Sequence, residues 1–233
     1  TQIETGVLKV SGNNGKVIVD CPAGPVTAYA NIESGKVKSV SFENVPSFVH
    51  TKDFPVKIDD FEFKIDIAYG GAFYGVVNTQ DLDIKAKKLD LDDMKKWGTK
   101  IKEYIEDNIE VRHPIEDING IYGVVFSEEP NDSAANLRNV TIFADEQIDR
   151  SPCGSGTAAR AAVLYKNGEL KLGESFVHES ITDEIFIGEV FAEEKVNDIN
   201  AIIPKITGSA YITGFHQFVT SADDPLNKGF LLK

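Results

Sequence analysis

The sequence predicts an α+β protein that is rich in strands and has few helices. Short runs of alternating apolar and polar residues, separated by Gly, Pro or Asn turns, recur along most of the chain, which is typical of strands with one buried face. Helical patterns are confined to two stretches, about 91–108 and 157–166. The 233 residues are 42% hydrophobic and 26% charged, a composition that favours a folded globular protein over a disordered one.

The N-terminal third is predicted to consist mainly of strands. The opening TQIETGVLKV reads as the end of a helix that runs into a turn and a strand. Turns at PAGP (22–25) and ESGK (33–36) then separate alternating segments. The expected strands are 16–20, 26–32 and 37–42, followed by three within 52–78.

The first helix is expected between a cap at Asp90 or Asp92 and about Asn108. Apolar residues fall three or four positions apart along it, which gives one apolar face that we expect in the core. These residues are Leu91, Met94, Trp97, Ile101, Ile105 and Ile109. Beyond it, strands are predicted at 120–126 and 140–143, a helix from Thr157 to about Lys166, and strands at 185–193 and 200–219.

Composition excludes several classes of function. A formal net charge of −13 without a Lys/Arg cluster argues against nucleic acid as a partner. No apolar run approaches ~18 residues, so a membrane span is not expected. Two cysteines, Cys21 and Cys153, are too few for a disulfide scaffold and favour a reducing, cytoplasmic setting. The His and Cys spacing predicts no metal site, and no nucleotide-binding glycine motif is present.

The most informative stretch is DRSPCGSGTAARAAVLY, residues 149–165. Cys153 precedes a glycine-rich turn that opens an Ala-rich helix. Free N–H groups at a helix start bind small anions such as carboxylates, and the helix dipole is expected to lower the pKa of Cys153 below its usual ~8.5. Asp149 would supply a negative charge for an ammonium group. The pattern therefore predicts an amino-acid site with a thiolate, the alternative being an inert, packed cysteine.

Seven segments of the chain resemble the proline racemase family, which includes proline racemases, 4-hydroxyproline 2-epimerases and trans-3-hydroxyproline dehydratases. The cysteine motif is the most specific of them, and together they span essentially the whole sequence. They are CPAGPV (21–26), NVPSFV (44–49), DIAYGGAFYGVV (66–77), RHP (112–114), FADEQIDRSPCGSGT (143–157), ITGSAYITGFHQFV (206–219) and DDPLNKGFLLK (223–233).

The resemblance implies a fold like that of diaminopimelate epimerase, with two similar domains, each a β-barrel-like sheet around a central helix. A faint echo between TGVLKV (5–10) and NGELKL (167–172) fits such a duplication. On this reading, residues 1–46 and 214–233 belong to an incomplete first domain, and 47–213 form the second. The resemblance also implies a homodimer, a small imino acid as substrate and no cofactor.

The implied chemistry is proton exchange at the α-carbon between two thiols, one on each face of the substrate. Carried over to matching positions, Cys153 is the second acid/base, Asp149 binds the substrate nitrogen, and Gly154 and Ser155 donate N–H groups to the carboxylate. Phe143 would form an apolar wall for the ring. Ser155 stands where many members have Thr.

Three functions stay open at this point. Racemisation or epimerisation of proline or hydroxyproline leads, because dehydratases usually replace the second cysteine with Thr and Cys153 is retained. A trans-3-hydroxyproline dehydratase is the alternative, and an inactive, truncated remnant is the third. The family's first cysteine motif would precede IETGVLKV, so we expect a chain that supplies only the second cysteine and does not racemise alone. Cys21 is predicted to be structural.

Overall fold

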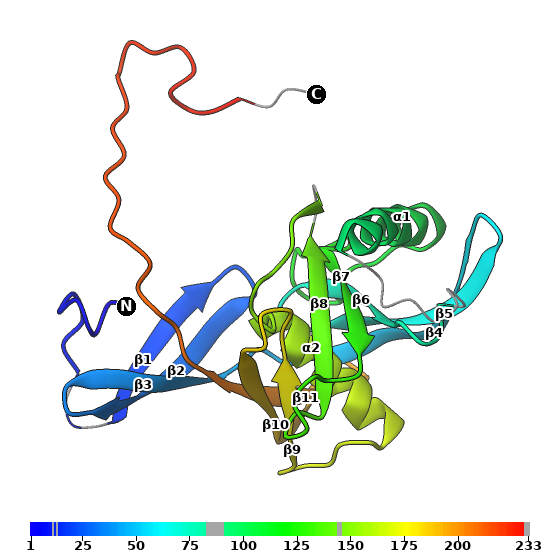
Figure 1. Ribbon diagram of the computed structural model, residues 1–233, viewed down its shortest axis with the longest axis horizontal. Helices are drawn as coiled ribbons and strands as arrows, with labels where there is room; N and C mark the ends of the chain where they lie inside the picture. Colours follow the sequence, from blue (N-terminus) through cyan, green and yellow to red (C-terminus); the bar gives the residue numbers. More distant parts are fainter. Residues whose placement is uncertain (11, 13, 83–90, 144–145, 231–233) are drawn as a thin grey trace.

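The computed structural model describes residues 1–10, 12, 14–82, 91–143 and 146–230, which form a strand-rich protein with two helices (Figure 1). The predicted class, mostly sheet with few helices, is confirmed. The strands are β1 (Asn14–Cys21), β2 (Gly24–Glu33), β3 (Lys36–Glu43), β4 (Phe48–Ile58), β5 (Phe61–Tyr69), β6 (Phe73–Asn78), β7 (Gly123–Glu128), β8 (Leu137–Phe143), β9 (Ser175–Glu179), β10 (Ile185–Val196) and β11 (Ile199–Gly208). The helices are α1 (Leu91–Asn108) and α2 (Gly154–Asn167).

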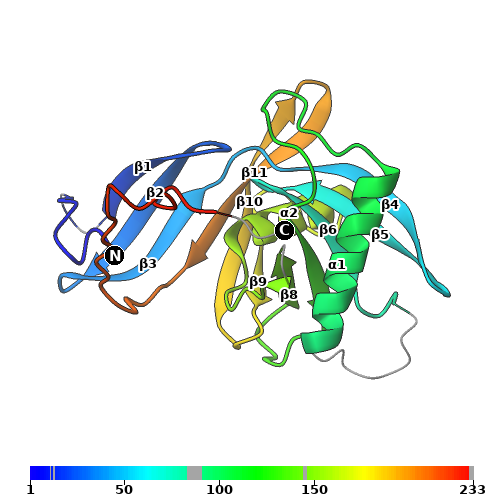
Figure 2. The same cartoon turned by 90° about the horizontal axis from the view of Figure 1, so that it is seen from above.

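Within the described residues the strands form one 11-stranded sheet, in the order β1-β2-β3-β11-β10-β9-β8-β7-β6-β5-β4. Neighbouring strands are antiparallel except for two parallel pairs, β6 with β7 and β8 with β9. The hairpin-connected strands β1–β3 project to one side of the rest (Figure 2) and join it where β3 pairs with β11. The third strand and the last strand of the chain are thereby neighbours in the sheet.

Helix α2 lies inside the curve of the sheet and packs against β4, β5, β6, β10 and β11. Its alanines Ala158, Ala159, Ala161 and Ala162 are at most 3% exposed. Because alanine side chains are short, strands can approach this helix closely from several sides. The Ala-rich composition of this helix therefore serves its packing against the sheet.

The closest approach is at Gly70, between β5 and β6. A Cβ at this position would lie 2.2 Å from the Ser155 carbonyl oxygen and 2.4 Å from the Ala159 nitrogen. Both are backbone atoms of α2, so the helix itself would have to move. Gly70 therefore sets how closely the start of α2 sits on the sheet.

We expect Gly70→Ala to lower the free energy of unfolding by about 1–3 kcal/mol, since overpacking against backbone has no flexible side chain to absorb it. Urea denaturation measures the change. Gly75→Ala is the matched control, because its Cβ would meet only side-chain ends at 3.0 Å or more. Equal losses in the two variants would contradict the assignment of the effect to the α2 backbone.

Helix α1 confirms the expected helix and its apolar face. Met94, Ile101 and Ile105 are at most 1% exposed and pack in the core beneath α1. Leu91, at the first position, is 40% exposed. The proposed cap at Asp90 lies outside the described residues.

The structure corrects several predicted boundaries. Helix α2 begins at Gly154 rather than Thr157, and β9 was not predicted at all. Residues 2–6 form turns rather than the end of a helix. The strand expected over 200–219 ends at Gly208, where the pairing of β11 with β3 stops.

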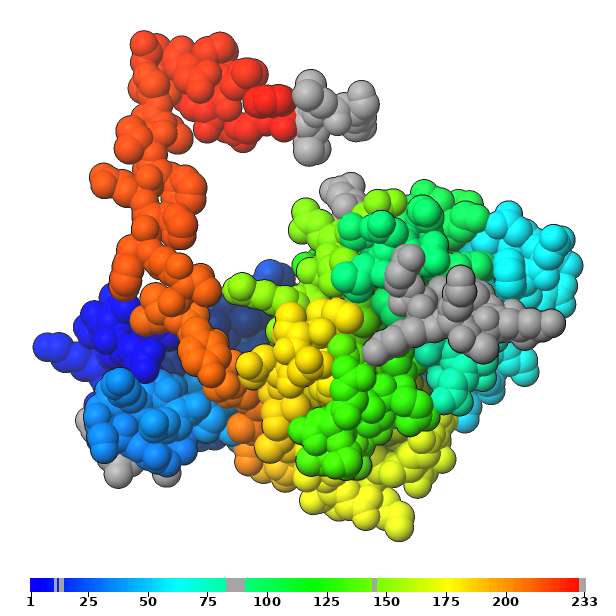
Figure 3. Space-filling model, in the orientation of Figure 1, coloured from blue at the N-terminus to red at the C-terminus, as the bar shows by residue number. Residues whose placement is uncertain are grey.

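Residues 209–230 extend away from the rest of the molecule (Figure 3). The alternating residues that suggested a strand are exposed there, as in Tyr211 at 80% and Phe218 at 90%. A strand needs a neighbour to accept and donate its backbone hydrogen bonds, and no described strand pairs with this segment. The apolar alternation was real, but alternation alone does not make a strand.

Candidate functional site

Cys153 caps the N-terminus of α2. Its backbone adopts φ 64° and ψ 113°, outside helical geometry, and its Sγ accepts a hydrogen bond from the Gly156 N–H at 3.3 Å. A Cβ at Gly156 would lie 3.0 Å from Sγ, so the absence of a side chain there makes room for the thiol. The motif thus places sulfur, rather than the usual hydroxyl or carboxylate, against the free N–H groups of the first turn.

Buried polar side chains fix the peptide that precedes the cysteine. The Pro152 carbonyl accepts hydrogen bonds from Asn139 Nδ2 at 2.9 Å and from Thr157 Oγ1 at 3.1 Å. Behind them, His178 Nδ1 lies 2.9 Å from Thr157 Oγ1. Burial, together with the charge of Arg160, lowers the pKa of His178 to about 3. His178 is therefore neutral, and because the Thr157 hydroxyl already donates to the Pro152 carbonyl, the tautomer that fits is the one in which Nδ1–H donates to Thr157 Oγ1. His178 thus orients Thr157, which in turn orients the Cys153 loop.

The thiol itself is enclosed, with Cys153 4% exposed. The Tyr74 hydroxyl lies 3.6 Å from Sγ and 2.7 Å from Ser155 Oγ, and Ser155 Oγ lies 3.9 Å from Sγ. Burial raises the pKa of the Cys153 thiol, whereas the hydrogen bonds from Tyr74 and Gly156 lower it. The net direction is upward, so the expected lowering of this pKa by the helix start is wrong: desolvation outweighs the donors.

The predicted binding residues lie around the thiol. Gly154 and Ser155 are the first two residues of α2, and both are half-buried. Phe143, at the end of β8, packs against the cluster that contains Tyr74 and Cys153. Asp149 is half-buried, and its Oδ1 accepts a hydrogen bond from the Ser151 N–H at 2.8 Å. The structure brings these residues together, while their roles toward a substrate stay predictions.

Sequence reasoning missed three aromatic residues beside the motif. Tyr74 is fully buried against Cys153, and its ring centroid lies 5.9 Å from that of Tyr122. Tyr122 also contacts Phe143, with centroids 5.1 Å apart. Phe42 of β3 lies 3.3 Å from where a Cβ on Gly154 would stand. For Tyr74 the sequence signal was the aromatic pair Phe73–Tyr74 after Gly70, which does not reveal which of the two rings faces α2.

Cys21 is a free, half-exposed cysteine at the end of β1. Ala23, two residues later, reaches the surroundings of the α2 start: a Cβ at Gly71 would lie 3.9 Å from Ala23 Cβ and 3.8 Å from Ser155 Cβ. The β1–β2 turn therefore lies near the motif. The structural role assigned to Cys21 stays a prediction.

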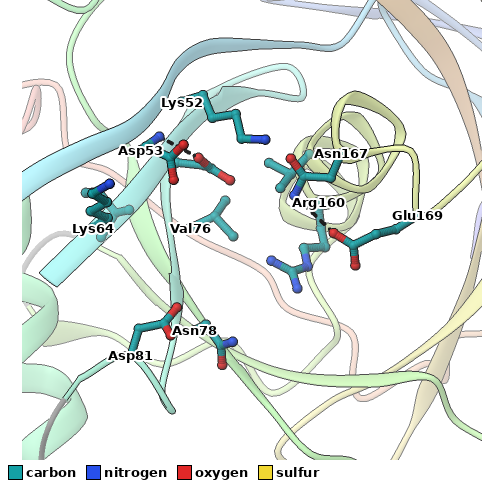
Figure 4. A pocket seen from close by; sticks show the side chains of 12 residues that line it. Lys52, Asp53, Lys64, Val76, Asn78, Asp81, Arg160, Asn167 and Glu169 are labelled. Atoms are coloured by element: carbon teal, nitrogen blue, oxygen red, sulfur yellow. Dashed lines mark hydrogen bonds between the residues drawn. The ribbon is translucent and has the colours of Figure 1, made fainter.

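A second feature of α2 is a cavity of about 360 Å³ lined by Arg160 and residues of β4–β6 (Figure 4). Arg160 is half-buried and, within the described part of the chain, has neither an ion pair nor a hydrogen bond. Asp66 accepts instead from the Asp53 N–H at 2.9 Å, and Glu169 from Asn167 at 3.0 Å. The lining has three cationic side chains against four carboxylates, so it offers an anion no net attraction.

The described residues hold no group of three or more His, Cys, Asp or Glu side chains placed to bind a metal ion. Over the same residues, neither helix combines the length and the apolar character that a membrane span requires.

Comparison with known proteins points to one family. The family model described as "Proline racemase" matches residues 1–231. A trans-3-hydroxy-L-proline dehydratase from Bacillus cereus is 56% identical over 231 residues, covering 99% of this chain and 69% of that protein. A proline racemase from Acetoanaerobium sticklandii is 42% identical over 231 residues, covering 98% and 69%.

A solved structure resembles the whole fold as well. The crystal structure of a hydroxyproline epimerase from Agrobacterium vitis, with bound trans-4-OH-L-proline, has a TM-score of 0.89 and 34% identity, covering 99% of this chain and 67% of that one. The expected resemblance is thereby confirmed, and with it the class of enzyme. The chain belongs to the proline racemase family, whose named relatives are racemases, epimerases and dehydratases.

Proposed function

We propose that Cys153 is an acid/base at the α-carbon of proline or hydroxyproline, in a cofactor-independent racemisation or epimerisation. The observation that carries the proposal is the thiol at the N-terminus of a buried helix, next to two N–H groups that helix geometry leaves without an internal partner. Those of Gly154 and Ser155 would bind the substrate carboxylate. As negative charge builds on that carboxylate, these donors stabilise it.

The remaining predicted residues complete the substrate site. Asp149 lies four residues before Cys153, and its Oδ2 would bind the ring nitrogen. Phe143 would pack against the ring carbons. In the two-thiol exchange we propose, Cys153 serves one face of the α-carbon and a second thiol serves the other.

Dehydration of trans-3-hydroxy-L-proline is a second candidate, favoured by the name of the 56% identical relative. In that reaction the thiolate takes the α-proton, the 3-hydroxyl leaves with a proton as water, and a carbon–carbon double bond forms. The abstraction needs a base on one face only. A single Cys153 thiolate therefore suffices for its first step.

Proton NMR in D₂O with L-proline, trans-4-hydroxy-L-proline and trans-3-hydroxy-L-proline distinguishes these reactions. If Cys153 acts alone, deuterium enters the α-position with retention, because the same thiol removes and returns the proton. Inversion shows that a second acid/base is present, and loss of the 3-hydroxy substrate shows dehydration. Absence of exchange and of dehydration with all three substrates would reject the proposal and leave the inactive remnant.

The division into domains and the assembly are part of the same proposal. We propose that residues 1–46 and 214–233 belong to one domain and 47–213 to another, in a cytoplasmic homodimer. Light scattering of the purified protein measures the assembly directly.

A further inference from the structure

Among the described residues, the hydroxyl of Tyr74 is the one side-chain donor from outside the motif within hydrogen-bonding distance of the thiol. It comes from β6, on the sheet, whereas Cys153 and Ser155 belong to the start of α2. It lies 2.7 Å from Ser155 Oγ and 3.6 Å from Cys153 Sγ, the latter within hydrogen-bonding range of sulfur. Two elements far apart in the sequence thus meet at one sulfur atom.

A thiol in this position needs donors if it is to ionise. Cys153 is 4% exposed, so water contributes little to solvating a thiolate. The Gly156 N–H supplies one hydrogen bond at 3.3 Å. Burial also raises the pKa of Tyr74, so its phenol keeps its proton and remains a donor wherever the cysteine titrates.

We propose that Tyr74 is a positioning residue for Cys153, and that its hydroxyl turns from Ser155 Oγ to donate to Sγ when the thiol loses its proton. The proposal rests on the proposed function, in which ionised Cys153 removes the α-proton. In the structure the Tyr74 hydroxyl shares a hydrogen bond with Ser155 Oγ, in which either oxygen can be the donor, and Ser155 Oγ also lies near the sulfur. Tyr74 thereby supplies the buried thiolate with a second hydrogen bond, in addition to the one from the Gly156 N–H at the helix start.

Titration of the thiolate by its ultraviolet absorbance tests this directly. The background is Cys21→Ser, which leaves Cys153 as the only thiol, and Cys153→Ser in that background gives the baseline. Tyr74→Phe is expected to raise the midpoint by about one pH unit, as loss of a hydrogen bond to a charged group does. The thiolate fraction at neutral pH then falls about tenfold, and alkylation of Cys153 by iodoacetamide slows with it.

Tyr122→Phe is the matched control. Tyr122 packs against Tyr74, is 54% exposed, and its hydroxyl makes no hydrogen bond within the described residues. A role of Tyr74 in packing alone would leave the Tyr74→Phe midpoint unchanged, or would shift both variants alike, and either result overturns the proposal. Circular dichroism confirms that each variant is folded.

The titration needs no substrate, so it separates this proposal from the proposed function. A raised midpoint in a protein that exchanges no α-proton supports the Tyr74 contact and rejects the function. If the midpoint is unchanged in a protein that does exchange the α-proton, the positioning role of Tyr74 is rejected and the proposed function is not affected.

Discussion

Cys153→Ser is expected to reduce the rates of α-proton exchange and of any dehydration by about a thousandfold. This is the size of the rate enhancement that a positioned general base typically provides. A serine hydroxyl fits the same cap and can accept the Gly156 N–H in place of sulfur. Its pKa is far above that of a thiol, so it provides almost no base at neutral pH. The same NMR assay in D₂O measures the loss.

Cys21→Ser is the control that the chain itself offers. Cys21 is half-exposed at the end of β1, and we expect its replacement to leave exchange unchanged. A matching loss in Cys21→Ser would mean that Cys21 takes part in the chemistry and would contradict its structural assignment. Exchange that survives in Cys153→Ser would instead remove Cys153 from the mechanism.

Glu179→Ala is expected to lower the free energy of unfolding by about 3–5 kcal/mol, because it leaves a buried arginine without its main counter-charge. Arg138 and Glu179 are 3% and 0% exposed and form an ion pair across the parallel strands β8 and β9. The other oxygen of Glu179 accepts the N–H groups of Asn131 at 2.8 Å and Asp132 at 3.1 Å. Urea denaturation measures the loss.

Asp183→Ala is the control that separates the effect of burying an ion pair from the effect of the ion pair itself on stability. Asp183 also contacts Arg138 Nη1, at 2.6 Å, but its side chain is 66% exposed. We expect a much smaller loss, since water replaces most of what an exposed carboxylate provides. Equal losses in the two variants would show that burial does not decide the effect.

The ion pair also bears on the site. Glu179 follows His178 on β9, and His178 orients Thr157 beside the Cys153 loop. A variant that loosens this end of β9 is therefore expected to weaken the cap as well. Sequence reasoning gave no sign of this connection, because β9 itself was not predicted.

What the sequence predicted well was local. The apolar face of α1 follows from a spacing of three and four residues, and the strands before residue 43 follow from alternation between turns. The second helix was also expected from its Ala-rich sequence, although its start was placed at Thr157 rather than at Gly154. Each of these features depends on residues that are close together in the chain, so it can be predicted from one sequence.

What it missed depends on contacts between distant segments. The position of Tyr74 depends on the register of β6 and on how closely Gly70 lets α2 approach. The direction of the Cys153 pKa depends on burial by strands that a helix-dipole argument does not include. The strand expected through residue 219 depended on a pairing partner, which alternation does not supply. Each of these features depends on how distant segments pack together, not on the local sequence of one segment.

The backbone at Cys153 has an evolutionary consequence. Its φ of 64° and ψ of 113° suit glycine, and a residue with a Cβ held there costs about 1–3 kcal/mol. Under selection for folding alone, mutation to glycine at this position would therefore be favoured. The backbone at this position therefore gives no folding advantage to cysteine over glycine, so a reason for the thiol has to come from something other than the conformation.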